Sequence, residues 1–215
     1  MYLCDQNMPP RLLADISRPP VFSYDGGNML PPVAHAAYRW LLLGGVRSGS
    51  NFHTDPFAMH AWNACLSGTK VWALYPPSHV PPGVKISSVS LSLGGRDAGG
   101  KRLPGNRSPE TVTNYHGPSA WEWFTGVLPH LSKREEGGTP RPEYPLVVVQ
   151  RAGDVVFTPS GWWHCVLNLE PDTLGFSEDV VSKSNVGKVL RALQASCPES
   201  ELYTALRRHI RELHD

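Results

Sequence analysis

The sequence FHTDPF, residues 52–57, places a histidine and an aspartate two positions apart in a segment that is typical of a strand. Residues i and i+2 of a strand point to the same face, so the spacing predicts that His53 and Asp55 converge while Phe52 and Thr54 point away. Such a pair can chelate a metal ion. Because H-x-D also arises by chance, and histidines are often structural, the pair alone leaves both interpretations open.

A third candidate ligand occurs much later in the chain. His164, in PSGWWHCVLNLE, begins a predicted strand after a tight turn at Gly161. Two imidazoles and one carboxylate from different strands of a β-sandwich form the facial triad of non-haem Fe(II) oxygenases, which leaves metal positions open for 2-oxoglutarate and dioxygen. Manganese, cobalt, nickel and zinc also accept these ligands, so the ligand types leave the choice of metal open.

A 2-oxoglutarate site also needs a cation to hold the distal carboxylate of the cosubstrate. Lys70 follows a predicted turn at Ser67–Thr69, and Asn63 lies on the strand before that turn. We expect both side chains to face the same pocket as the metal ligands. The alternative is a solvated hairpin lysine, which the aromatic surroundings of TKVWALYPP disfavour.

The segments RWLLLGGVRSGSNFHTDPFAMHAWNACLSGTKVWALYPP and GDVVFTPSGWWHCVLNLE resemble the Jumonji-C (JmjC) Fe(II)/2-oxoglutarate oxygenases, closest to their branch of arginine demethylases and lysyl hydroxylases. The resemblance covers about residues 2–185 and fails through 91–110. It implies that iron is bound by His53, Asp55 and His164, and 2-oxoglutarate by Lys70, Asn63 and a hydroxyl group, which is that of Ser177 or, alternatively, Thr173. Strands and a pocket tyrosine that the family carries upstream are expected to be missing.

The implied activity is that of a dioxygenase that uses Fe(II), 2-oxoglutarate and O2 to hydroxylate protein side chains, releasing succinate and CO2. Lysyl hydroxylation is favoured over demethylation of N-methyl arginine or lysine. The implied substrate is a protein with a basic side chain, such as a histone or an RNA-processing factor, and the implied location is the nucleus, with the cytoplasm as the alternative. The alternative function is a weak or inactive JmjC scaffold that binds chromatin or RNA-processing partners.

The 21 prolines and 20 glycines among 215 residues favour many short strands. The resemblance implies a mainly β fold, the double-stranded β-helix or cupin-type jelly roll, with peripheral helices. From residue 38 the pattern predicts an antiparallel meander with a hairpin at Ser67–Thr69, a helix over 119–131, and further strands over 146–150, 155–158, 164–169 and 173–181. Residues 1–37 are predicted to be irregular after a first short strand.

Two units are predicted: a JmjC oxygenase domain over residues 1–183, with a flexible glycine-rich insertion at 91–110, and a helical extension over 184–215. Ser196 and Glu199 are spaced as a capping box for the last helix. The apolar stripe of the helical pair is expected to pack on the jelly roll or on a second copy, which would form a homodimer.

Other features exclude classes of partner. A formal charge of +1 and a mixed-charge C-terminal helix argue against direct binding of nucleic acid. Four cysteines without C-x-x-C spacing indicate reduced thiols in a protein that is not secreted, and no apolar run is long enough for a membrane span. Glu178 and Asp179 are either solvated charges at a strand end or partners for a basic substrate side chain.

Overall fold

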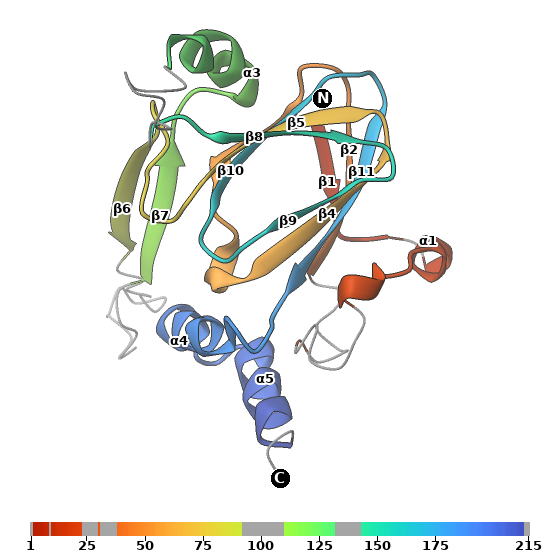
Figure 1. Ribbon diagram of the computed structural model, residues 1–215. Coiled ribbons are helices and arrows are strands. Elements are labelled where there is room, and N and C mark those ends of the chain that lie inside the picture. Colours follow the sequence, from red (N-terminus) through yellow and green to blue (C-terminus); the bar gives the residue numbers. More distant parts are fainter. Residues whose placement is uncertain are drawn as a thin grey trace, which may run out of the picture.

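The computed structural model describes residues 2–8, 10–22, 30, 38–91, 110–131 and 143–212. Two antiparallel sheets face each other in it (Figure 1). The first sheet has the order β1 (Tyr2–Asp5), β2 (Arg39–Gly44), β11 (Thr173–Val180), β4 (His60–Ser67), β9 (Val155–Thr158). The second has the order β3 (Gly49–His53), β10 (Trp163–Asn168), β5 (Thr69–Tyr75), β8 (Leu146–Arg151). The predicted mainly β class and jelly-roll architecture are confirmed.

The predicted meander is wrong, because strands joined by a short turn lie in different sheets. β4 pairs with β11 and β9, whereas β5 pairs with β10 and β8. The turn between β4 and β5 is therefore a corner between the sheets, where Gly68 adopts φ +80° and an added Cβ would lie 2.5 Å from the Thr173 hydroxyl. Pairing with distant strands prevails because it lets both sheets bury their inner faces against each other.

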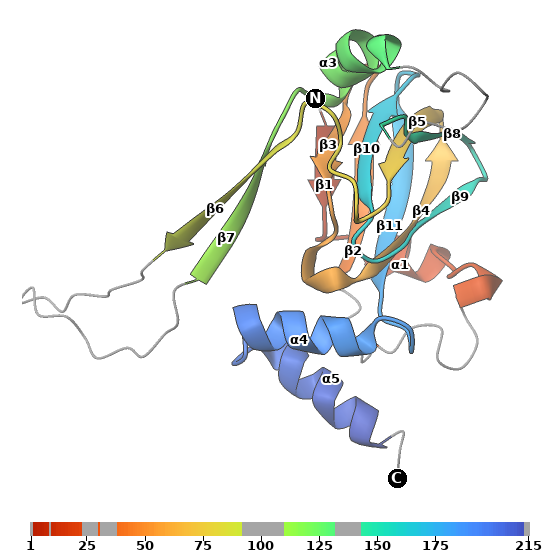
Figure 2. The same ribbon diagram turned by 60° about the vertical axis from the view of Figure 1, so that its left-hand side comes forward.

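Two segments contain structure that the sequence pattern did not predict. The N-terminal region holds α1 (Pro10–Asp15) and the 3-10 turn η1 (Pro20–Phe22). β6 (Lys85–Leu91) and β7 (Glu110–His116) form a two-stranded hairpin that projects away from the two sheets (Figure 2). The predicted insertion therefore begins and ends on strand residues, and its remainder, 92–109, lies outside the described residues.

The predicted helix over 119–131 is confirmed as three short helical pieces in succession. They are α3 (Ala120–Glu122), the π-helical η4 (Trp123–Val127) and the 3-10 helix η5 (Leu128–His130). Ser119 and Glu122 form a capping box at its start, with the Ser119 hydroxyl accepting from the Glu122 amide. Trp123 anchors the segment against the jelly roll, where its ring packs on Phe52.

The predicted helical pair consists of α4 (Val186–Ser196) and α5 (Glu201–Glu212), beneath the sheets in Figure 2. The capping box at Ser196 is wrong: Ser196 ends α4, and Ser200 instead accepts from the Tyr203 amide, because a turn separates the two helices. Their apolar stripe packs within the chain, against Leu30, Met59 and Val181.

Neither helix, nor any other in the described part of the chain, has the length and apolar character needed to cross a membrane. The division at residues 183–184 stays a prediction.

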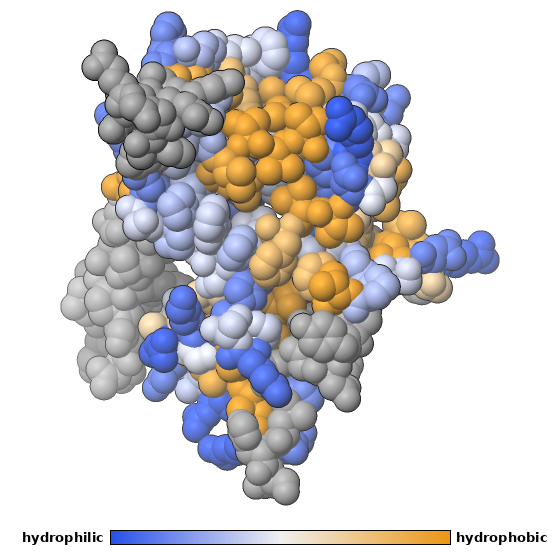
Figure 3. Space-filling view, in the orientation of Figure 1, coloured by the Kyte–Doolittle hydropathy of each residue, from blue (hydrophilic) through white to orange (hydrophobic). Residues whose placement is uncertain are grey.

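β8 and β9 are the edge strands of the two sheets on one side of the molecule. Five apolar side chains of these strands are more than a third exposed: Leu146, Val147, Val149, Val155 and Phe157. Figure 3 shows an apolar patch where Figure 1 places β8 and β9. Apart from Arg151 at the end of β8, these two strands lack the charged residues that usually protect a sheet edge.

Glu178, on β11, forms ion pairs that link this strand to Arg18 of the N-terminal region and to Arg39 of β2. Its carboxylate is buried and accepts from the guanidinium groups of Arg18 and Arg39, with Arg18 Nε at 3.1 Å and Arg39 Nη2 at 3.3 Å. Glu178 is therefore neither a solvated charge nor a partner for substrate, because both arginines already occupy it.

We expect Glu178→Gln to lower the free energy of unfolding by about 1–3 kcal/mol, because it removes the charge that both partly exposed arginines share. Urea denaturation measures the change. Glu212→Gln is the matched control: Glu212 pairs with Arg208 at 3.9 Å on the surface and should change stability by less than about 0.5 kcal/mol. Equal effects of the two substitutions would contradict a structural role for Glu178.

Candidate metal centre

The three candidate ligands come from two neighbouring segments of the second sheet. His53 is the last residue of β3, and its cross-strand partner is His164, the second residue of β10. Asp55 lies just beyond β3, in extended conformation before the 3-10 turn η3 (Pro56–Ala58). The predicted convergence of His53 and Asp55 is therefore confirmed, although the strand itself ends at His53.

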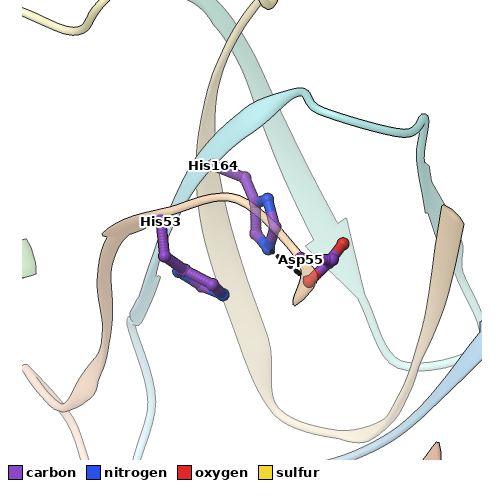
Figure 4. Close-up of side chains that lie close together, drawn as sticks. All are labelled: His53, Asp55 and His164. Atoms are coloured by element: carbon purple, nitrogen blue, oxygen red, sulfur yellow. Dashed lines mark ion pairs between the residues drawn. The ribbon is translucent and has the colours of Figure 1, made fainter. Parts of the chain in front are cut away.

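The three side chains turn toward one another (Figure 4). One ligand atom from each residue lies within 4.8 Å of the other two. The rings of His53 and His164 have centroids 4.1 Å apart, and His164 Nε2 is 3.6 Å from Asp55 Oδ1. These atoms are close enough to share one ion.

Backbone carbonyl groups fix which nitrogen of each ring is available. His53 Nδ1 lies 2.7 Å from the Asn51 carbonyl oxygen, and His164 Nδ1 lies 3.2 Å from the Trp162 carbonyl oxygen. A carbonyl only accepts, so in both rings Nδ1 carries a proton and donates it. In the neutral tautomer that this contact selects, Nε2 is the nitrogen available to a metal ion.

The electrostatics also favour metal binding. Burial, with a smaller contribution from His53, holds the pKa of His164 well below its ordinary value, so this imidazole is neutral at pH 7. Burial raises the pKa of Asp55 to about 6, and His53 partly opposes the shift. Asp55 Oδ2 is buried without a hydrogen-bond partner among the described residues. A buried carboxylate oxygen in this state is costly, and a cation would satisfy it.

Lys70 lies in the same cavity, of about 230 Å³, as the triad. Its side chain is only 2% exposed, and Nζ donates to Asn63 Oδ1 at 3.1 Å. Within the described part of the chain no carboxylate lies at ion-pair distance from Nζ, and burial lowers the pKa of Lys70 to about 8. The expectation that Lys70 and Asn63 face the metal pocket is confirmed, and a solvated hairpin lysine is excluded.

The two hydroxyl candidates on β11 differ in position. Ser177 lines the cavity, and its hydroxyl donates to the Trp62 carbonyl at 3.0 Å. Thr173 is fully buried, donates to the Glu170 carbonyl at 2.8 Å, and is not among the residues that line the cavity. The position of Ser177 therefore agrees better with the predicted role.

Several residues of the cavity were not predicted. Tyr2 of β1 lines it, so a tyrosine is present in the pocket although the family's pocket tyrosine was expected to be missing. Asp179 also lines it, and burial, followed by the charges of Asp55 and Glu178, raises its pKa to about 9. Of the two interpretations of Asp179, burial excludes a solvated charge, while a role as partner for a basic substrate side chain stays a prediction. Strand alternation places it on the face of Ser177. His60 lies outside the cavity lining and accepts from the Ser160 amide.

Gly175, on β11, is packed against the ammonium group of Lys70. A Cβ at this position would lie 2.2 Å from Lys70 Nζ and 3.1 Å from the Ala64 carbonyl oxygen. Gly175→Ala must therefore displace the end of the Lys70 side chain, and small misplacements of a binding group are costly.

If Lys70 binds the cosubstrate, Gly175→Ala should weaken 2-oxoglutarate binding by about 10- to 100-fold and leave metal affinity unchanged. Calorimetric titration with 2-oxoglutarate and, separately, with Mn²⁺ measures both quantities. Gly126→Ala is the control, because a Cβ there meets nothing within 4 Å. Unaltered 2-oxoglutarate affinity in Gly175→Ala would contradict the assignment of Lys70.

The fold and the triad define the class of the protein: a cupin-type jelly roll with a candidate metal centre at the end of β3. The chain belongs to the cupin-like domain family, whose model matches residues 18–184. This membership and the relatives below confirm the resemblance to the JmjC oxygenases.

Curated relatives support this placement. The chain is 36% identical over 84% of its length to the lysine-specific demethylase JMJ21 of Arabidopsis thaliana, covering 16% of that protein. It is 34% identical over 73% of its length to the arginine-specific demethylase JMJ22 of the same plant, covering 26% of it. It is 27% identical over 86% of its length to the bifunctional arginine demethylase and lysyl-hydroxylase psr-1 of Caenorhabditis elegans, covering 41% of it. The chain thus spans less than half of each relative.

Proposed function

We propose that this chain is an Fe(II)- and 2-oxoglutarate-dependent oxygenase that acts on protein side chains. One observation carries the proposal: a buried lysine without an acidic partner among the described residues shares a cavity with two histidines and an aspartate. A metal site alone would not require such a cation. A dicarboxylate cosubstrate bound to the metal would neutralise it.

Some residues of the cavity would bind the metal, and others would bind the cosubstrate. Nε2 of His53 and His164 and the Asp55 carboxylate would hold Fe(II), with both imidazoles oriented by backbone carbonyls. Lys70 would donate to the distal carboxylate of 2-oxoglutarate, and Asn63 would orient the ammonium group. The Ser177 hydroxyl would turn from the Trp62 carbonyl to donate to the same carboxylate. With both bound, iron and 2-oxoglutarate supply the oxidation of a C–H bond by O2, with release of succinate and CO2.

The chain's own groups prepare the site for this chemistry. Trp40 and Trp72 line the cavity and give it apolar walls that exclude water. Burial keeps His164 neutral and therefore able to bind metal without first losing a proton.

The proposed substrate is a protein with a basic side chain. The names of the relatives support it, since they act on lysine or arginine residues. We infer hydroxylation of lysine as the reaction, with demethylation of N-methyl lysine or arginine as the alternative, and a nuclear protein such as a histone or RNA-processing factor as the substrate.

Formation of succinate from 2-oxoglutarate by the purified chain tests the proposed activity. Turnover should require added Fe(II) and O2 and should stop on addition of a chelator. A peptide library that contains lysine, arginine and their N-methyl forms then identifies the substrate, since hydroxylation adds one oxygen and demethylation removes one methyl group. Absence of both turnover and 2-oxoglutarate binding would overturn the proposal in favour of a non-catalytic scaffold.

A further inference from the structure

A single side chain from outside the jelly roll contacts both segments that carry the candidate metal ligands. Tyr115 lies near the end of β7, at the base of the projecting hairpin. Its hydroxyl is 3.0 Å from Thr54 Oγ1, and its ring packs edge-on against Trp163 at a centroid distance of 4.8 Å. Thr54 lies between His53 and Asp55, and Trp163 directly precedes His164.

The segment that carries His53 and Asp55 is held by the sheet only as far as His53. β3 ends at His53, so ladder hydrogen bonds no longer fix Thr54 and Asp55. The pairing of β10 with β3 shifts register between His164 and Val166, which interrupts that ladder beside the third ligand, whereas β10 pairs with β5 without a shift from Trp163 to Asn168. The position of the Asp55 carboxylate therefore depends on how Thr54 is anchored.

We propose that Tyr115 is a positioning residue of the metal centre. Its hydroxyl group fixes Thr54, and through the backbone on either side it fixes His53 and Asp55. Its ring packs on Trp163, which β5 already holds in the sheet, and so ties Thr54 to the fixed start of β10. The inference rests on the proposed function only in that the triad binds a metal ion.

Metal affinity tests the inference without any need for turnover. Mn²⁺ titration followed by the electron paramagnetic resonance signal of free Mn²⁺ gives the dissociation constant. Tyr115→Phe keeps the ring and loses the hydroxyl, and we expect it to weaken binding about 3- to 10-fold. Thr54→Val removes the other end of the same hydrogen bond and should have the same effect, with no further loss in the double variant.

A spectroscopic readout separates positioning from a general loss of stability. The ligand-field absorption bands of bound Co²⁺ should shift in Tyr115→Phe, because the ligands are held in an altered arrangement. Ser87→Ala is the matched control: it removes the 3.0 Å hydrogen bond between Ser87 and His116 in the same hairpin and leaves the contacts of Tyr115 with Thr54 and Trp163 in place. It should leave both affinity and spectrum unchanged.

Wild-type affinity and an unshifted Co²⁺ spectrum in both Tyr115→Phe and Thr54→Val would overturn the positioning role, and so would an equal effect of Ser87→Ala. If Tyr115→Phe fails to fold, Thr54→Val decides the question from the jelly-roll side. An unaltered chain that binds neither Mn²⁺ nor Co²⁺ would overturn this inference together with the metal centre. Metal binding without 2-oxoglutarate turnover would overturn the proposed activity alone.

Discussion

Replacing His164 with alanine is expected to abolish Fe(II)-dependent formation of succinate and to weaken metal binding by at least about 100-fold. Loss of a residue that merely orients a metal ligand already costs about 10- to 100-fold in affinity, so loss of a ligand should cost at least as much. His164 is also only 5% exposed and lies beside both other ligands, so its loss removes a donor from the centre of the site.

Thermal unfolding with and without Mn²⁺ distinguishes a lost ligand from a damaged fold. A metal that binds only the native state raises Tm, and the rise grows with metal concentration. The increase should be present in the wild type and absent in His164→Ala. His60→Ala is the control: His60 bonds Ser160 and Ser184 outside the triad, so its loss lowers Tm but preserves the increase on adding metal. A metal-induced increase that persists in His164→Ala would refute the triad.

Lys70→Met should have opposite effects on stability and on cosubstrate binding. Methionine keeps the apolar stem and removes the ammonium group. Truncating one partner of a buried charge pair costs about 2–5 kcal/mol, so the affinity for 2-oxoglutarate should fall at least about 30-fold. Without cosubstrate the same change should stabilise the fold, because it removes a buried charge that has no acidic partner among the described residues.

The pH dependence of stability and of 2-oxoglutarate affinity in the wild type tests the same assignment of Lys70. The pKa of Lys70 is lowered to about 8 from 10.5, so between these values the unfolded chain binds more protons at this group than the folded chain, and the contribution of Lys70 to stability rises as pH rises. Affinity for 2-oxoglutarate should instead fall above about pH 8, because a neutral lysine must take up a proton before it can pair with the carboxylate. Both trends should vanish in Lys70→Met. If the Lys70→Met variant binds 2-oxoglutarate as tightly as the wild type, the assignment of Lys70 is wrong.

The side chains that define the cavity were predictable because their chemistry is local and unusual. His53 and Asp55 share a face by strand periodicity, and an aromatic segment around Lys70 indicates burial. Periodicity also distinguishes Ser177 and Asp179, which face the cavity, from Glu178, which faces Arg18 and Arg39 on the other side.

What could not be predicted depends on which strands pair. The sequences of β6 and β7, KISSVSL and ETVTNYH, are mostly polar and show no sustained alternation of apolar residues, so the hydrophobic pattern did not reveal this hairpin. The prediction of a meander was wrong because the sequence of a turn such as Ser67–Thr69 does not show whether its two strands pair with each other or enter opposite sheets. Tyr2 reaches the cavity because β1 pairs with β2. The sequence of one short strand does not indicate which strand it pairs with.

The direct pairing of His53 with His164 has a consequence for biogenesis. More than a hundred residues separate the two histidines, so the site cannot exist until early and late parts of the nascent polypeptide have met. Pairings so distant along a chain form slowly, after local segments have collapsed. The ion therefore cannot nucleate folding and must enter a finished barrel, so a chelator present during refolding should leave the refolding rate unchanged and lower only the final melting temperature.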